Sequence, residues 1–229
     1  MDRWVDFAGL FNFRDVGALT GRPGVIYRSD ALCSLVDDDR PRYEALGVQT
    51  VIDLRRAEEI EIQGRAPSWS YRQWHNLTVR ETTWPVGECA DAEAVAVYLA
   101  DVYLQMNPAD IASVLTLLAE PDIGPAVIHC AGGRDRTGVV VALLLSLVGV
   151  PDEEIGADYT LTEQFTQRWL KWRFDTTGET IELPPNILHT PPGAILLYLT
   201  RLRERHGSVQ AFLSLDSATV SALRSIVVA

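Results

Sequence analysis

Short apolar runs alternate with longer stretches of helical periodicity along most of the chain. Runs of apolar residues predict strands at 25–29, 50–54 and 126–129, and we expect a further strand at 71–77. Apolar positions at helical spacing predict helices over 92–106, 111–118, 137–148, 195–202 and 220–227. Strands that alternate with helices predict an α/β fold, with a mostly parallel central sheet and helices on both of its faces.

The stretch 127–138 is the one around which this pattern is organised. It reads Val-Ile-His-Cys-Ala-Gly-Gly-Arg-Asp-Arg-Thr-Gly. A short apolar run ends in a polar turn that contains glycine, and an unbroken apolar run follows from 139 to 148, which predicts strand, loop and helix in that order. Unpaired amides and the positive end of the helix dipole meet at the start of such a helix, so we expect this loop to bind an anion.

The residue types in the loop suit attack on a phosphoryl group. A helix N-terminus and nearby cations favour the thiolate of Cys130, which is a nucleophile. Arg136 presents a planar fork of donors that matches two phosphoryl oxygens. Gly132 and Gly133 let the backbone approach a ligand closely. Thr137 would place a hydroxyl beneath the sulfur, where it stabilises the thiolate as it leaves.

Several polar residues around the loop have two interpretations each. His129 either favours the thiolate through its hydrogen bonds or is a core histidine with its own partners. Arg14, Arg28 and Asp30 either line the mouth of the phosphate pocket or form structural or solvated ion pairs. The sequence leaves both interpretations open for all four.

Composition describes a single globular domain over residues 1–229. The chain is 47% hydrophobic and 22% charged, and no segment is low in complexity. Its formal net charge of −11 disfavours nucleic acid as a partner. The longest apolar run, 139–148, is far shorter than the roughly 20 residues that span a bilayer, so we expect no stable membrane insertion.

The cysteines and the first residues bear on the compartment. Cys33, Cys89 and Cys130 are too few and too scattered for a disulfide framework or a zinc site. Residues 1–6 lack the basic region and apolar core of a secretory signal. We therefore expect a cytoplasmic protein that needs neither metal nor other cofactor, because positioning and charge stabilisation suffice for the chemistry described below.

Residues 129–138 resemble the HCxxGKDRTG signature of the bacterial tyrosine phosphatase family, and their Cys-x5-Arg pattern is shared by all cysteine-dependent tyrosine phosphatases. Three further stretches resemble that family: 12–17, 27–32, and 51–56 with Glu58 or Glu59 after it. Arg134 departs from the usual lysine of the signature. Of the 20 Lys and Arg residues in the chain only Lys171 is a lysine, so the change fits the composition.

The resemblance implies hydrolysis of a phosphomonoester in two steps, through a phosphocysteine intermediate on Cys130. The phosphate-binding loop would be Ala131, Gly132, Gly133, Arg134, Asp135 and Arg136. Asp135 is the first candidate for the general acid, because the family has a catalytic Asp at that loop position. Asp53 is the second, and its alternative is a carboxylate that pairs with Arg136 or another arginine. The expected substrate is a phosphotyrosine protein or a phosphoinositide, and the oligomeric state stays open.

Family members carry a helical lid where this chain has residues 160–192. Three cations and three aromatic residues alternate within 167–174, on a predicted helix. A lid would shield the thiolate and touch a lipid surface through its aromatic residues. The alternative is a surface helix that packs Trp169 and Trp172 into the domain and leaves Arg and Lys in solvent.

Two other classes of protein share part of this pattern. A rhodanese or an arsenate reductase also has a cysteine at the start of a helix, but the first normally has a shorter loop and the second a relay of further cysteines. A non-catalytic phosphate-binding or scaffold module would be expected to lack the nucleophile or the arginine. This chain has Cys130, Arg136 and Thr137 together, which favours the phosphatase.

Overall fold

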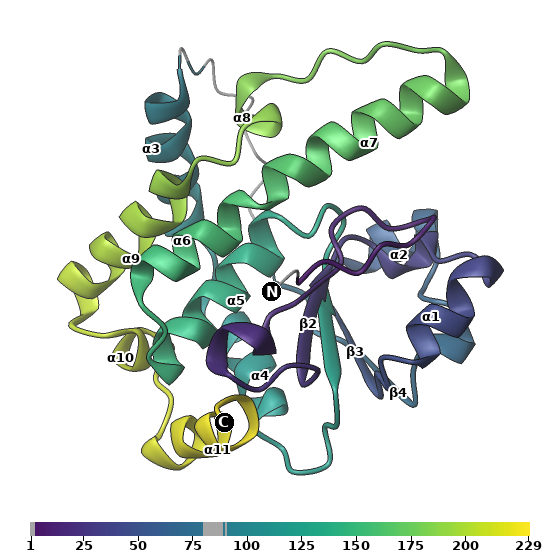
Figure 1. Cartoon of the computed structure of the whole chain (residues 1–229). Helices are drawn as coiled ribbons and strands as arrows, with labels where there is room; N and C mark the ends of the chain where they lie inside the picture. Colours follow the sequence, from purple (N-terminus) through teal and green to yellow (C-terminus); the bar gives the residue numbers. More distant parts are fainter. Residues whose placement is uncertain (1–2, 80–88, 90) are drawn as a thin grey trace.

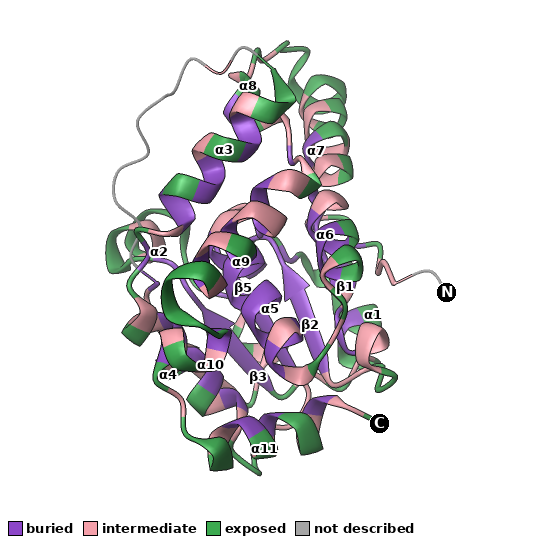
Figure 2. Ribbon diagram, turned by 90° about the vertical axis from the view of Figure 1, so that its left-hand side faces the viewer, coloured by how far each residue is buried: buried purple, intermediate pink, exposed green. Residues whose placement is uncertain are grey.

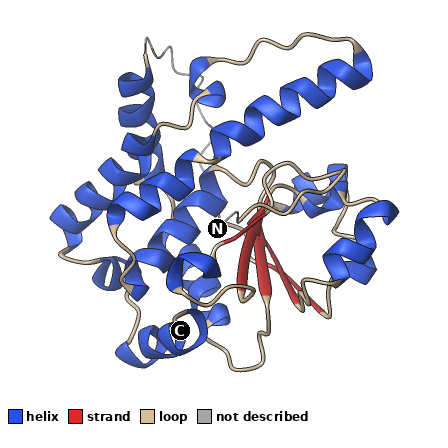
Figure 3. Ribbon diagram, in the orientation of Figure 1, coloured by secondary structure: helices blue, strands red, loops and turns tan. Residues whose placement is uncertain are grey.

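A computed structural model describes residues 3–79, 89 and 91–229. The strands form one central sheet (Figure 3). Its five strands lie in the order β1-β2-β5-β3-β4. Their bounds are β1 Arg14–Asp15, β2 Ile26–Ser29, β3 Thr50–Asp53, β4 Gln73–Asn76 and β5 Ala126–His129. β1 is antiparallel to β2 and the other neighbours are parallel. The prediction of a mostly parallel sheet is confirmed, and all four predicted strands exist within a few residues of their expected bounds.

The sheet separates two layers of unequal thickness (Figure 1). The thick layer contains α3, α4, α5, α6, α9, α10 and α11, and the thin one contains α1 and α2. The helices are α1 Arg40–Glu44, α2 Ala57–Gln63, α3 Ala92–Tyr103, α4 Pro108–Leu118, α5 Asp135–Val148, α6 Asp152–Thr160, α7 Thr162–Thr177, α8 Pro185–Leu188, α9 Pro192–His206, α10 Val209–Leu213 and α11 Ser217–Val227. Short 3-10 helices lie at Gly17–Thr20, Leu32–Ser34, Asp37–Asp39 and Ser68–Ser70.

The alternation of side chains along the strands divides the core in two. Ile26, Ile52 and Ile128 pack into the large cluster under the thick helical layer. Their neighbours Tyr27, Val51 and Val127 point to the other face, where they meet aromatic residues of the N-terminal segment and α1. β2, β3 and β5 are buried at every position (Figure 2), as is typical of parallel strands covered by helices on both faces.

Helix α5 is central to the thick layer, and this explains its unbroken apolar sequence. Ten of its residues between Thr137 and Leu147 are buried, on all sides of the helix. It begins at Asp135, two residues before the predicted start, and ends at Val148; Gly149 follows as its C-cap, with a φ of +95° that suits glycine. Three of the catalytic candidates, Asp135, Arg136 and Thr137, therefore lie in the first turn of a deeply buried helix.

Helix α7 extends away from the body of the domain, and an extended segment returns from it to α8 (Figure 1). The predicted helix at 167–174 lies within α7. Of its aromatic residues, Trp172 is 44% exposed and Phe174 is 54% exposed. Trp172 lies against Phe11, with ring centroids 5.5 Å apart. No helix in the described ranges is long and apolar enough to cross a membrane.

Candidate active site

The loop between β5 and α5 closes tightly against the end of β2. Gly133 has φ +68°, a conformation that side chains rarely adopt, and a Cβ there would lie 2.4 Å from the carbonyl oxygen of Ser29. Cys130 lies at the start of the loop and is only 3% exposed. The amide of Gly138 bonds the carbonyl of Arg134 at 2.8 Å, which starts the first turn of α5. We call residues 130–136 the catalytic loop.

Three consecutive carbonyl groups of the catalytic loop are bound from outside. The amide of Ala31 donates to the carbonyl of Ala131 at 2.9 Å. Asn12 Nδ2 donates to the carbonyl of Gly132 at 2.8 Å, and Arg28 Nη2 donates to the carbonyl of Gly133 at 2.7 Å. In a planar trans peptide the N–H points away from the C=O. Holding these carbonyls outward therefore directs the next three amides into the loop, where they can bind an anion.

Arg136 is held by a carboxylate from the other side of the sheet. Its Nη1 and Nη2 donate to Glu59 Oε2 and Oε1 at 2.7 and 2.8 Å. Burial alone would raise the pKa of Glu59, but the hydrogen bonds from Arg136 and Arg56 outweigh it and lower that pKa to about 2. The carboxylate therefore stays ionised and orients the guanidinium plane. The resemblance to the family left Glu58 and Glu59 as alternatives after the stretch 51–56, and it is Glu59 that contacts Arg136.

Asp135 lies in a network of buried hydroxyl groups and one arginine. Tyr103 donates its hydroxyl to Asp135 Oδ1 at 2.6 Å, and the hydroxyls of Tyr103 and Tyr159 are 2.5 Å apart. Burial raises the pKa of both tyrosines, so both stay protonated. Arg134 Nε also donates to Asp135 Oδ1, at 2.9 Å, while its Nη1 donates to the carbonyl of Ile187 in α8 at 2.8 Å.

Asp53 is the last residue of β3 and is fully buried. Arg55 donates its Nε and Nη2 to the two oxygens of Asp53, at 2.9 and 2.7 Å. Burial raises the pKa of Asp53, but the bonds from Arg55 and the nearby His129 more than compensate and lower it. These contacts support the interpretation of Asp53 as a carboxylate that pairs with an arginine, and the arginine is Arg55.

His129 and Thr137 are buried at the two ends of the loop. His129 Nδ1 lies 3.1 Å from the carbonyl oxygen of Cys130, and its Nε2 lies 3.6 Å from Asp53 Oδ2. Burial lowers the pKa of His129, so the ring is neutral at pH 7. Within the described residues the Thr137 hydroxyl has no hydrogen-bond partner. Its action on the Cys130 sulfur stays a prediction.

Arg14 and Arg28 lie beneath the loop rather than at its mouth. Both are buried, at 0% and 1% exposure, and both bind Asp158 on α6. The structural interpretation of these two arginines is therefore confirmed. Asp30 is also buried and accepts the amides of Phe11 and Asn12 at 3.0 and 3.2 Å, so it shapes the turn that carries Asn12.

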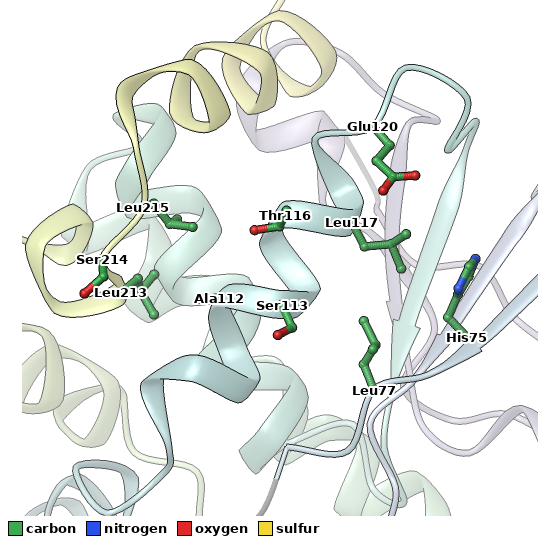
Figure 4. Close-up of a pocket in the computed structure, with 10 residues that line it drawn as sticks. All are labelled: His75, Leu77, Ala112, Ser113, Thr116, Leu117, Glu120, Leu213, Ser214 and Leu215. Carbon is green, nitrogen blue, oxygen red and sulfur yellow. The ribbon is translucent and has the colours of Figure 1, made fainter.

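Among the described residues, two hollows adjoin the catalytic loop. One, of about 250 Å³, is lined by Gly132, Arg134 and Asp135 on one side and by Phe165, Trp169 and Ile187 on the other. The second, of about 480 Å³, lies beyond the same two aromatic residues and reaches Ala131 and Asp30. A third, of about 420 Å³, lies between β4, α4 and α10, and its ten lining residues include none from the catalytic loop (Figure 4). The two hollows beside the catalytic loop therefore both lie against α7.

Sequence analysis missed Tyr103, Tyr159 and Asp158 as parts of the site. All three lie on helices whose pattern predicts only a buried face, and no motif distinguishes them. Asp158 gives one signal, since it is an acidic residue one position from Tyr159 and three from Ile155, both buried. A carboxylate on a buried helical face needs a partner.

The family model described as the tyrosine phosphatase family matches residues 5–229. The chain belongs to the tyrosine phosphatase family. It is 28% identical to the triple specificity protein phosphatase PtpB of Mycobacterium tuberculosis, an alignment that covers 96% of this chain and 98% of PtpB. It is 29% identical to a tyrosine-protein phosphatase of Nostoc commune, over 61% of this chain and 49% of that protein.

Among solved structures, the chain is similar to the core catalytic domain of the PP-IP phosphatase SIW14 from S. cerevisiae in complex with citrate. The sequence identity is 14%, the TM-score is 0.43, and the match covers 69% of this chain and 78% of that one. In this tyrosine phosphatase, the stretches at 12–17, 27–32 and 51–56 surround the catalytic loop. Asn12 and Arg28 bond its carbonyls directly, and Asp53 contacts His129.

Proposed function

We propose that this phosphatase hydrolyses phosphomonoesters with Cys130 as nucleophile and Arg136 as the oxyanion clamp. The observation that carries the proposal is the outward bonding of three consecutive loop carbonyls, which directs amides toward the space above Cys130. Together with the Arg136 fork held by Glu59, these amides match the three equatorial oxygens of a phosphoryl group in transfer.

In the first step the Cys130 thiolate attacks phosphorus in line with the ester bond. An S–P bond forms, the P–O bond to the leaving group breaks, and Asp135 gives its proton to the departing oxygen. In the second step water attacks phosphorus and transfers a proton to the Asp135 carboxylate. Inorganic phosphate leaves and the thiolate is restored. Asp53, paired with Arg55, acts in this scheme as a support for the strand end.

We propose that the preferred substrate is a phosphotyrosine protein or a phosphoinositide. The hollow of about 250 Å³ beside Gly132 and Asp135 has mainly apolar walls from Phe165, Trp169 and Ile187, which suits an aromatic ring or a hydrocarbon chain. Arg134 beside the nucleophile would add positive charge for a second phosphate. Its bonds to Asp135 and Ile187 leave less of its fork for a ligand, and this favours phosphotyrosine.

Residues 160–192 would act as a lid over this site. Phe165 and Trp169 of α7 face the catalytic loop across the hollow, and α8 is tied to Arg134 through the carbonyl of Ile187. Only Thr162 and Thr166 of α7 are buried. A segment with so few buried contacts opens at a low cost in free energy, which a lid requires.

The test is phosphate release, without added metal, from phosphotyrosine and phosphoserine peptides and from monophosphorylated phosphoinositides. Cys130→Ser is the blank, because a serine hydroxyl is a far weaker nucleophile at neutral pH. Release that depends on Cys130 supports the phosphatase, and the preferred substrate decides between protein and lipid. Equal release by Cys130→Ser contradicts the mechanism. Binding of phosphate without any turnover would instead support a phosphate-binding module.

A further inference from the structure

Asp158 on α6 is the centre of a buried cluster of arginines below the catalytic loop. It is 1% exposed and accepts Arg3 Nη1 at 2.7 Å, Arg14 Nε at 3.1 Å and Arg28 Nη1 at 2.7 Å. Burial alone would raise the pKa of Asp158, but the three positive charges hold it well below its usual range. One carboxylate therefore holds three cations that would otherwise repel each other in a buried space.

Two of these arginines lead directly to the catalytic loop. Arg28 uses Nη1 for Asp158 and Nη2 for the carbonyl of Gly133, at 2.7 Å in both cases. Arg14 bonds Asp158 and also donates Nη1 to the side-chain oxygen of Asn12. That bond fixes which way the Asn12 amide points, so its nitrogen faces the carbonyl of Gly132 at 2.8 Å.

We propose that Asp158 is a positioning residue for catalysis, which sets the peptide planes of the catalytic loop through Arg28 and through Arg14 with Asn12. The inference rests on the proposed phosphatase activity, although Asp158 itself touches neither substrate nor nucleophile in this scheme. Its carboxylate keeps two donors aimed at the carbonyls of Gly132 and Gly133. Without the carboxylate, Arg14 and Arg28 repel each other, and those carbonyls lose their fixed partners.

The consequence is larger in the transition state than in the ground state. Loop amides that can rotate still attract a phosphate, but they no longer match the trigonal bipyramidal geometry of phosphoryl transfer. Loss of Asp158 should thus lower kcat more than it raises KM. Orthovanadate, which binds such loops with five-coordinate geometry, should lose affinity in parallel with kcat/KM.

Arg3 provides a matched control for this network. It contributes one ion pair to the same carboxylate, but among the described hydrogen bonds its side chain reaches only Asp158. Arg3→Gln therefore weakens the arginine cluster without removing a donor to the loop, whereas Arg28→Gln removes one. Asp152 provides the second control, since it is an acidic residue at the start of the same helix that pairs with Arg203.

The experiment measures kcat and KM for p-nitrophenyl phosphate, the inhibition constant of orthovanadate, and the thermal unfolding midpoint, for Asp158→Asn, Arg28→Gln, Arg3→Gln and Asp152→Asn. Assays are run well below each midpoint. We expect kcat to fall by about 100-fold in Asp158→Asn and Arg28→Gln, as for a small misplacement of catalytic groups. In the same two variants the inhibition constant of orthovanadate should rise as kcat/KM falls. The two control variants, Arg3→Gln and Asp152→Asn, should keep the wild-type kcat, even where their thermal unfolding midpoint is lower.

A purely structural role predicts a different result. If folded Asp158→Asn and Arg28→Gln keep kcat and vanadate affinity within about twofold of Arg3→Gln, the proposal is overturned. If Asp158→Asn does not fold, the comparison of Arg28→Gln with Arg3→Gln decides in the same way. If the wild type shows no turnover, the proposed function fails, and vanadate binding by calorimetry still tests the positioning role separately.

Discussion

Arg136 and Glu59 form a two-point contact across the sheet, with both guanidinium Nη atoms on the two carboxylate oxygens at 2.7 and 2.8 Å. The contact joins the first turn of α5 to the first turn of α2. Because a fork bound at two points cannot swivel, its remaining donor edge has a fixed direction. That direction is toward the space above Cys130 in the mechanism proposed here.

Glu59→Gln should lower kcat/KM for p-nitrophenyl phosphate by about 10- to 100-fold, a loss on the order of 2 kcal/mol in transition-state stabilisation. A neutral amide accepts through one oxygen only, so Arg136 loses one of its two anchors. Glu58→Gln, an exposed neighbour on the same helix, is the matched control and should keep kcat/KM. Equal values for the two variants would show that Glu59 does not orient Arg136.

The same pair predicts a pH dependence of stability. The pKa of Glu59 is about 2 in the folded protein, below its ordinary value when unfolded. Its contribution to the free energy of unfolding is therefore present above about pH 4.5 and is lost as the pH falls toward 2. Since Glu59 is partly exposed, we expect this contribution to be about 1 kcal/mol. The free energy of unfolding, measured in urea, should fall less between pH 6 and pH 3 for Glu59→Gln than for wild type.

Gly133→Ala should destabilise the protein by about 2 kcal/mol or more. The new Cβ would lie 2.4 Å from the carbonyl of Ser29, and φ is +68°. Gly132→Ala is the matched change one residue earlier, where the Cβ meets Phe165 at an ordinary 3.7 Å. Thermal unfolding should separate the two variants clearly. A Gly133→Ala protein as stable as Gly132→Ala would mean that the loop conformation is not required for folding.

Asp135→Asn should slow substrates with poor leaving groups most. The asparagine has no proton to give to a departing alkoxide, whereas a p-nitrophenolate leaves without help. We expect kcat to fall by about 100-fold for an alkyl phosphate and much less for p-nitrophenyl phosphate. The measurement is kcat for a series of aryl and alkyl phosphates. A uniform loss across the series would assign Asp135 to positioning instead.

Arg134→Lys should loosen α8 while it keeps the positive charge. Arg134 spans Asp135 and the carbonyl of Ile187 with two different nitrogens, and a single ammonium cannot donate in both directions from one rigid plane. Amide hydrogen exchange over residues 185–190 should accelerate relative to wild type, with α5 unchanged. Unaltered exchange over 185–190 would show that this contact does not restrain the segment.

The strand, loop and helix of the catalytic loop could be predicted because their determinants are local. Buried strands and a buried helix carry apolar runs, and a thiol separated from an arginine by five residues closes into one anion-binding turn. The parallel sheet could be predicted as well, because strands that alternate with helices along the chain favour it. The stretches at 12–17 and 27–32 could also be located from the sequence, which left open whether Arg14 and Arg28 line the pocket or form structural ion pairs.

Only the tertiary structure decided which groups hold the loop in shape. Arg136 meets Glu59 across 77 positions of sequence, and Arg28 meets Asp158 across 130. Such pairings depend on how helices pack on the sheet, and a buried charge takes whichever partner that packing brings within hydrogen-bond distance. Local spacing determines the reacting groups, whereas packing determines the directions in which they point.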